Sequence, residues 1–184
     1  MDAEFEDTWF SVGIIFWGLL MLIALISVLL LGAVIYDIVS HRLPNYYLLL
    51  GLLLAFGWQA WMAGWSGVLT AGAGFLTGFA LFVPFYALGG MAAGDVKFMA
   101  VVGSFLGITG ALWAGAYSLM AGSVLGILYL LYKGHLGKLV VRYWAMAATR
   151  SRIAAEEHDA ARHRFPYAIA IAVGTLLSLY WTPI

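Results

Sequence analysis

The longest uncharged stretch of this sequence runs from residue 43 to residue 94 and reads LPNYYLLLGLLLAFGWQAWMAGWSGVLTAGAGFLTGFALFVPFYALGGMAAG. Its 52 residues include no Asp, Glu, Lys or Arg, whereas about one residue in four of a soluble domain is charged. A helix needs about 20 mostly apolar residues to cross a bilayer. The stretch is therefore long enough for two membrane-spanning helices joined by a short turn.

Three further stretches without charge lie on either side of this one, at residues 8–36, 98–132 and 165–184. Their lengths of 29, 35 and 20 residues predict one, two and one further spans. The whole chain is 64% apolar and 10% charged, with a mean hydropathy of +0.97. We therefore expect an all-α integral membrane protein, a single domain over residues 1–184, with six transmembrane helices near residues 9–35, 47–63, 67–87, 97–112, 115–132 and 166–183.

The basic residues orient these six helices in the membrane. All nine Lys and Arg fall on one side of the predicted spans, at Arg42, Lys97, Lys133, Lys138, Arg142, Arg150, Arg152, Arg162 and Arg164. Loops rich in Lys and Arg remain in the cytoplasm. The pattern therefore places the loops that follow the first, third and fifth spans inside, and both ends of the chain outside.

Residues 133–164 break the apolar pattern. They carry seven basic and three acidic residues, a net charge of +4, with apolar residues at helical spacing at Leu136, Leu139, Val140, Tyr143, Trp144 and Ala147. Basic residues of an amphipathic helix meet anionic lipid while its apolar face enters the interface. We expect an amphipathic helix on the cytoplasmic surface here, and a direct role in substrate binding is the alternative.

Composition also excludes several kinds of chemistry. The chain contains no cysteine, which rules out disulfides, thiol nucleophiles and Cys-ligated metals. Its formal net charge is zero, which would argue against a nucleic-acid surface if the charge were evenly spread, but it is not. We expect no nucleic-acid partner. No pattern of metal ligands or cofactor-binding residues was found in the sequence, and we expect neither a metal nor a cofactor.

Two carboxylates stand apart from the other acidic residues. Asp37 and Asp95 each follow a long apolar run, and the predicted topology puts both at the cytoplasmic level. An ionisable group at the edge of the hydrocarbon is costly, which makes both functional candidates. Two neighbouring carboxylates share a proton, so one can activate water while the other protonates a carbonyl oxygen or leaving amine. Helix dipoles favour an ionised Asp95 and a protonated Asp37.

Other roles for the two aspartates remain open at this point. Each could cap a helix or pair with a basic neighbour. Paired membrane carboxylates also form proton or cation pathways in small transporters, although the sequence shows no inverted repeat of the kind many transporters contain. A catalytically inactive scaffold of a secretion apparatus is a third reading.

The sequence around the two aspartates resembles a known family. Residues 37–45, DIVSHRLPN, look like the first signature of type IV prepilin peptidases, in which an Asp precedes an aliphatic-Pro-Asn end. Residues 89–97, GGMAAGDVK, are similar to the second signature, Gly-x-Gly-Asp before Val-Lys. Residues 165–170, FPYAIA, resemble a Pro-Tyr-Gly segment ahead of the last span. The three segments occur in the family's order and extend over nearly the whole chain.

The resemblance implies that Asp37 and Asp95 are the catalytic pair of an aspartic endopeptidase. Its substrate would be the basic leader of a pilin-like precursor, cut after a glycine on the cytoplasmic side of the bacterial inner membrane. The short chain is similar to the minimal members that serve tight-adherence (Flp) pili and lack methyltransferase activity. Other pilus assembly proteins would be further partners, and both ends of the chain would be periplasmic.

Six residues of the signatures are expected to support the catalytic pair: Pro44, Asn45, Gly94, Lys97, Pro166 and Tyr167. Pro44 should separate the first helix from the second, and Asn45 should cap the second helix. Lys97 should lie at the level of the lipid headgroups. The chain departs from the family pattern at Ala92 and Ala168, where the family has glycine. Neither departure changes a carboxylate.

Overall fold

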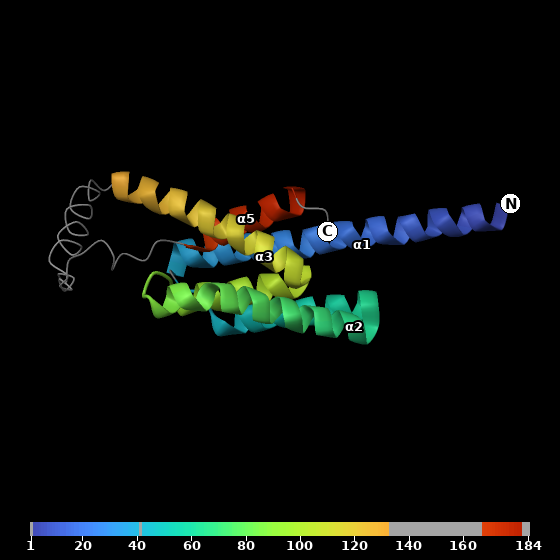
Figure 1. Ribbon diagram of the computed structural model, residues 1–184, viewed down its shortest axis with the longest axis horizontal. Helices are drawn as coiled ribbons and strands as arrows, with labels where there is room; N and C mark the ends of the chain where they lie inside the picture. The colour runs from blue at the N-terminus through green and yellow to red at the C-terminus, as the bar shows by residue number, and fades with distance from the viewer. Residues whose placement is uncertain (1, 41, 133–166, 182–184) are drawn as a thin grey trace.

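A computed structural model describes residues 2–40, 42–132 and 167–181 of the chain. Four helices account for nearly all of them: α1 (Asp2–Ser40), α2 (Asn45–Ala87), α3 (Ala93–Tyr132) and α5 (Tyr167–Trp181), as Figure 1 shows. The described ranges contain no strand. The all-α prediction is therefore confirmed.

The predicted number of six membrane-spanning helices is wrong. Three of the four described helices are long and apolar enough to cross a membrane, over Phe16–Ser40, Asn45–Ala87 and Ala93–Tyr129. Helix α5 has 15 residues, about 22 Å of helix at 1.5 Å per residue, less than the roughly 30 Å hydrocarbon core. The amphipathic helix expected within residues 133–164 lies outside the described residues.

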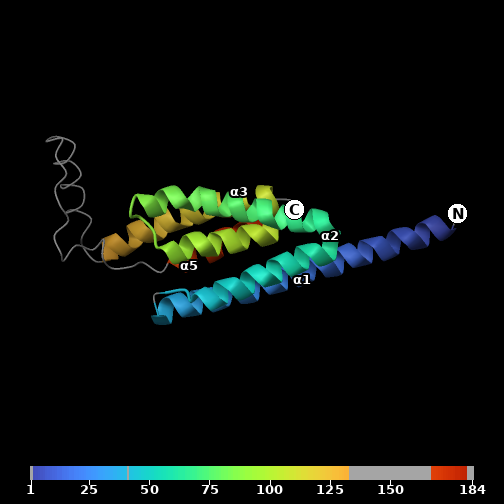
Figure 2. The same cartoon turned by 90° about the horizontal axis from the view of Figure 1, so that it is seen from below.

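Each of the long helices α2 and α3 is interrupted by one glycine. Gly64 has φ 58° and ψ −134°, and Gly107 has φ 70° and ψ −171°, a left-handed conformation that glycine adopts readily. Residues eight apart in a straight helix are separated by about 12 Å. Gly67 and Gln59 are nevertheless so close that a methyl group on Gly67 would collide with the Gln59 carbonyl oxygen. Both helices therefore fold back on themselves, and the loops expected at these places shrink to almost a single residue (Figures 1 and 2).

This folding gathers the helix ends at one end of the bundle, which we call the loop end. Figures 1 and 2 show there the last turn of α1, both ends of α2, both ends of α3 and the start of α5. The glycine breaks point toward the opposite end, which is also where α1 begins. Segments near residues 40, 90 and 167 are consequently neighbours although they are far apart in the sequence.

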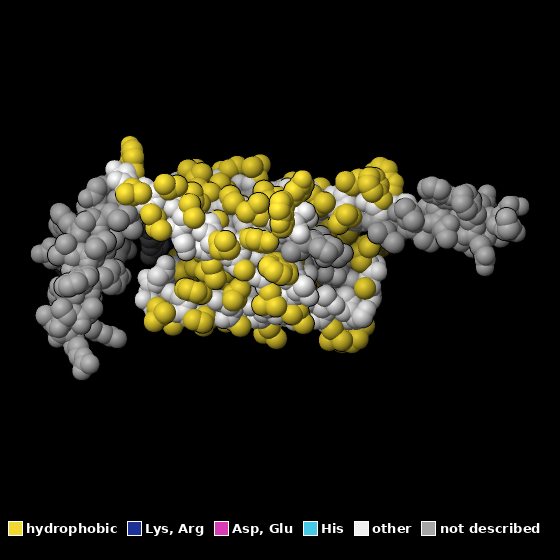
Figure 3. Space-filling view, turned by 45° about the horizontal axis from the view of Figure 1, so that its top comes forward, with side chains coloured by type: hydrophobic (Ala, Val, Ile, Leu, Met, Phe, Trp, Pro, Cys, Tyr) yellow, Lys and Arg dark blue, Asp and Glu magenta, His cyan; other side chains and the backbone are white. Residues whose placement is uncertain are grey.

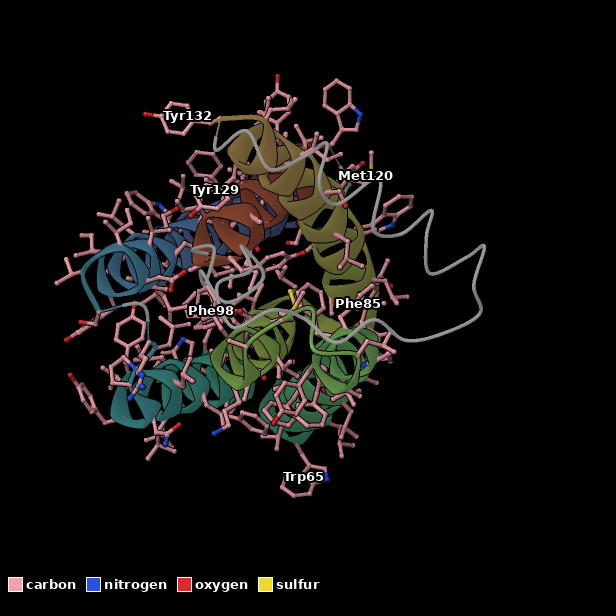
Figure 4. All side chains as sticks on the ribbon, turned by 90° about the vertical axis from the view of Figure 1, so that its left-hand side faces the viewer. Trp65, Phe85, Phe98, Met120, Tyr129 and Tyr132 are labelled. Carbon is pink, nitrogen blue, oxygen red and sulfur yellow. The ribbon has the colours of Figure 1, made fainter. Side chains whose placement is uncertain are left out.

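The core surrounds the first half of α3. Its large apolar side chains are fully or almost fully buried, and Phe98 lies among the helices in the end view of Figure 4. Helix α2 approaches α3 closely at Gly74 and Gly78, which have no side chain. A methyl group on either glycine would collide with the backbone of Gly103 or Met99. Small residues allow such contact between helices in lipid.

The outer surface is apolar, as expected of helices in contact with lipid. Figure 3 shows hydrophobic side chains covering the described part of the visible face. Trp61 and Trp65, which flank the break in α2, are 85% and 76% exposed, and Figure 4 shows Trp65 pointing away from the bundle. Tyr180 and Trp181 are likewise exposed at the last turn of α5. Aromatic residues of this kind favour the membrane interface, here at the end opposite the loop end.

Candidate active site

Asp37 lies in the last turn of α1 at the loop end, with only 7% of its surface exposed. Its Oδ2 accepts a hydrogen bond of 3.0 Å from the backbone N–H of Ala168, the second residue of α5. The first N–H groups of a helix have no partner within the helix. The carboxylate from α1 therefore satisfies one of them and caps α5.

Asp95 lies in the first turn of α3, as predicted, and is also 7% exposed. Its Oδ2 accepts a hydrogen bond of 3.2 Å from the backbone N–H of Ala92, while its own N–H donates to the Ala92 carbonyl at 3.1 Å. The side chain thus reaches back to the N-cap residue as in one half of a capping box. These bonds fix the orientation of the carboxylate at the start of the helix.

The two carboxylates have similar electrostatic surroundings. Each accepts a backbone N–H at the N-terminus of a helix, where the helix dipole stabilises negative charge. The assignment of Asp37 as the protonated partner rested on its place at the C-terminal end of α1, and the N–H of Ala168 adds a stabilising donor that this argument did not include. The assignment stays a prediction.

The start of α5 connects the two carboxylates. Ala168 binds Asp37, and its neighbour Tyr167 is close enough to Asp95 for a direct electrostatic interaction. The Tyr167 hydroxyl donates to the Ser118 carbonyl at 3.3 Å, and its ring meets that of Phe82 edge-on at 6.1 Å between centroids. The start of α5 is thus anchored on α2 and α3, with Ala168 bound to Asp37 and Tyr167 within electrostatic range of Asp95.

The first two signature segments also contact each other. A methyl group built on Gly94 would lie 3.7 Å from the Cβ of Leu43, and the Lys97 ammonium donates to Asn45 Oδ1 at 3.2 Å. Helix α2 has Pro44 as its N-cap, with no side-chain capping bond. The prediction that Asn45 caps this helix is therefore wrong, because its side chain binds Lys97 instead. All three segments named from the sequence meet at the loop end.

A family model described as Peptidase_A24, type IV leader peptidase family, matches residues 23–131. The chain belongs to the type IV leader peptidase family. The match contains both aspartates and the first two signature segments, and the start of α5 lies beyond it. Neither a curated protein nor a solved structure matches the chain significantly.

Membership of the type IV leader peptidase family makes the chain a protease, and its long apolar helices make it a membrane protein. Of the signature residues that the family resemblance singled out, Gly94 is half-buried and Lys97 is exposed. Pro166 lies outside the described residues. Within residues 2–40, 42–132 and 167–181 no three His, Asp or Glu side chains gather in a way that could hold a metal ion.

The backbone N–H of Ala168 was missed at the sequence level. The residue attracted notice only as a departure from the family glycine, because a main-chain donor has no signature of its own. Two sequence features together could have indicated this bond. Asp37 lies at the end of one predicted helix, and Pro166 marks the start of another, whose first N–H groups need an acceptor.

Proposed function

We propose that the protein is a prepilin leader peptidase in which Asp37 and Asp95 together activate a water molecule. The observation that supports this most is the convergence on the start of α5, where Ala168 binds one carboxylate and Tyr167 lies beside the other. The three segments that carry the family resemblance therefore lie together at the loop end, which supports their acting as one site. A pair of membrane aspartates that served only as helix caps would not require all three.

The proposed mechanism gives a task to each part of the site. One carboxylate removes a proton from water, which attacks the scissile carbonyl carbon, while the other carboxyl gives its proton to the carbonyl oxygen. The proton taken from water then passes to the leaving amine as the C–N bond breaks, and the intermediate returns its hydroxyl proton to the second carboxylate. The N–H groups of Ala92 and Ala168 hold the carboxylates in fixed orientations. Fixed orientation reduces the entropy lost on reaching the transition state.

The proposed substrate is a pilin-like precursor with a basic leader, cut after a glycine. Arg42 and Lys97 lie beside the site at the loop end, and basic loops remain in the cytoplasm. Cleavage would then take place at the cytoplasmic face of a bacterial inner membrane, with both ends of the chain in the periplasm. The connections at residues 41–44 and 88–92 are short, and the chain has no cysteine, which fits the minimal tight-adherence type without methyltransferase activity.

Cleavage by purified protein in lipid vesicles tests the proposal. A synthetic precursor with a basic leader, a glycine and an apolar segment is the substrate, and mass spectrometry locates the cut. We expect Asp37→Asn and Asp95→Asn each to abolish cleavage, with the double variant no worse, because residues that act as a unit are not additive. Asp7→Asn makes the same chemical change outside the signature segments and should cleave normally. Retained cleavage in either single Asn variant contradicts the aspartic mechanism.

A further inference from the structure

Among the contacts between helices α1 and α2 is a hydrogen bond from one partly buried tyrosine. The hydroxyl of Tyr47, in the first turn of α2, donates to the backbone carbonyl of Leu29 within α1. That carbonyl lies inside a continuous helix and already belongs to its own ladder of hydrogen bonds. The tyrosine therefore adds a polar link between two helices at a place where neither helix needs one to complete its backbone.

The contact is shaped on both sides by glycine. A methyl group on Gly32 would collide with the Tyr47 hydroxyl, so the ring fits against α1 only because that position has no side chain. In return, a methyl group on Gly51 of α2 would lie 2.5 Å from the Leu29 side chain. The two helices thus interlock, with Tyr47 in the space at Gly32 and Leu29 in the space at Gly51.

The same tyrosine also holds the residue next to Asp37. The rings of Tyr36 and Tyr47 have centroids 5.3 Å apart and are tilted by 52°. Tyr47 therefore contacts α1 at two levels, immediately before Asp37 and at Leu29. Eight residues of helix separate Leu29 from Asp37, about 12 Å, so the contact covers the last turns of α1 before the carboxylate.

The position of α1 matters because it alone carries Asp37. A slip of one residue along the helix moves a side chain by about 1.5 Å and turns it by about 100°. Displacement of a catalytic group by about 1 Å can cost a hundredfold in rate. The link at Ala168 holds the carboxylate itself, whereas Tyr47 contacts the body of the helix behind it.

We propose that Tyr47 is a positioning residue, which fixes the rotation and height of α1 so that Asp37 faces Asp95. The inference rests on the proposed function, since it concerns the geometry of the proposed catalytic pair. Tyr47 does not touch the reacting atoms and acts through Leu29 and Tyr36.

The first test compares two tyrosine variants in the vesicle cleavage assay. Tyr47→Phe keeps the ring and removes the bond to Leu29. Tyr46→Phe is the matched control, because that hydroxyl lies 3.2 Å from the Tyr36 hydroxyl on an exposed surface. We expect Tyr47→Phe to lower kcat about ten- to hundredfold with KM within about threefold, since substrate contacts are unchanged. Tyr46→Phe should match the parent protein.

A second variant approaches the same contact from α1. Gly32→Ala places a methyl group against the Tyr47 hydroxyl and should lower kcat as Tyr47→Phe does. The combined variant should be less impaired than the product of the two effects, because both changes disrupt one contact. If Tyr47→Phe does not fold, Gly32→Ala decides the question.

A distance measurement makes the result independent of activity. The chain has no cysteine, so spin labels can be placed at Val39→Cys in α1 and Leu88→Cys in the loop after α2, both highly exposed. Tyr47→Phe should shift or broaden the distance distribution, and Tyr46→Phe should leave it unchanged. Unchanged distances together with a normal kcat overturn the positioning role. Absence of cleavage by the parent protein contradicts the proposed function, and the distances then still decide whether Tyr47 fixes α1.

Discussion

The carboxylate of Asp37 and the backbone N–H of Ala168 are 131 residues apart in the sequence and 3.0 Å apart in space. Their hydrogen bond joins the end of α1 to the start of α5. Because the donor belongs to the main chain, every amino acid except proline supplies it. The geometry of Asp37 is therefore insensitive to most side-chain changes at position 168 but sensitive to loss of that one N–H.

Substitutions of Ala168 separate these two properties. Ala168→Pro removes the donor, and a hydrogen bond to a charged group contributes about 1.5–3 kcal/mol, so we expect cleavage to fall about ten- to hundredfold. Ala168→Gly keeps the N–H and restores the family residue, and should cleave at nearly the parent rate. Because Ala168 is fully buried, Ala168→Val controls for added bulk with the donor present. Equal losses in the Pro and Val variants would assign the effect to packing.

A glycine of α3 leaves room for Tyr167. A methyl group on Gly122 would lie 2.5 Å from the Tyr167 hydroxyl, whereas the same group on Gly126, one turn further along, meets nothing within 4 Å. Overpacking typically costs about 1–3 kcal/mol, so Gly122→Ala should lower the thermal stability in detergent and slow cleavage. Gly126→Ala should be neutral or slightly stabilising, by up to about 1 kcal/mol. Similar melting temperatures for the two variants would contradict the anchoring of α5 at Gly122.

The departure at Ala92 should be harmless. The left-handed residue of this loop is Gly89, with φ 77°, and the part that Ala92 plays for Asp95 depends on its backbone N–H. Ala92→Gly should change the cleavage rate by less than about tenfold, or 1.4 kcal/mol of barrier. Gly89→Ala should instead cost about 1–2 kcal/mol of stability, because a Cβ is disfavoured in that conformation. A rise of several orders of magnitude in Ala92→Gly would identify the natural chain as a nearly inactive family member.

The bond between Lys97 and Asn45 should couple the first two signature segments without adding much stability. Both residues are exposed, and the bond joins a charged lysine to a neutral amide, whereas even exposed ion pairs contribute only about 0.2–1 kcal/mol. We expect Lys97→Met and Asn45→Ala to lower cleavage by similar factors and their double variant to be no worse than either. Combining Lys97→Met with Ser66→Ala, next to the break in α2 and opposite the loop end, should give simply additive effects. Additive losses in the first pair would show that the two residues act independently.

The orientation in the membrane is open to chemical labelling. Ser66→Cys places a thiol next to the break in α2, and Leu88→Cys places one in the exposed loop before α3. In intact cells an impermeant thiol reagent applied from the periplasm should label position 66 and leave position 88 unlabelled until lysis. The reverse pattern would contradict a cytoplasmic site. The parent protein has no cysteine, so labelling reports the introduced thiol alone.

The charge and apolar patterns predicted the helical class. They also predicted that the segments containing Asp37 and Asp95 lie at the same end of the helix bundle. Both follow from the bilayer, which admits long uncharged helices and confines charge to their ends. The helix count was wrong because a reversal needs only one residue in a left-handed conformation. At Gly64 and Gly107 that conformation is a local backbone property. The gap predicted at residues 64–66 contains Gly64, whereas the gap predicted at residues 113–114 lies beyond Gly107.

The contacts that complete the site were not predictable from residue types. Asn45 is a good helix cap by preference, yet its partner is Lys97, because the tertiary contact with α3 competes with the local one. In the sequence, nothing distinguishes Tyr47 from the other apolar residues of a predicted span. Only the fold shows that Gly32 lies opposite its hydroxyl. Long-range pairing of this kind depends on how helices are rotated about their axes, and that rotation follows from packing across the whole bundle.

The role of α5 also sets the order in which the molecule becomes complete during synthesis. Chains emerge from the ribosome with their N-terminal part first, so α1, α2 and α3 enter the membrane while the Ala168 N–H does not yet exist. Until α5 has been made and has docked, Asp37 lacks the donor that orients it and Tyr167 is absent from its place beside Asp95. On the proposed function, a nascent chain therefore carries both aspartates before the start of α5 orients them, and we expect hydrolysis to begin only after α5 has docked.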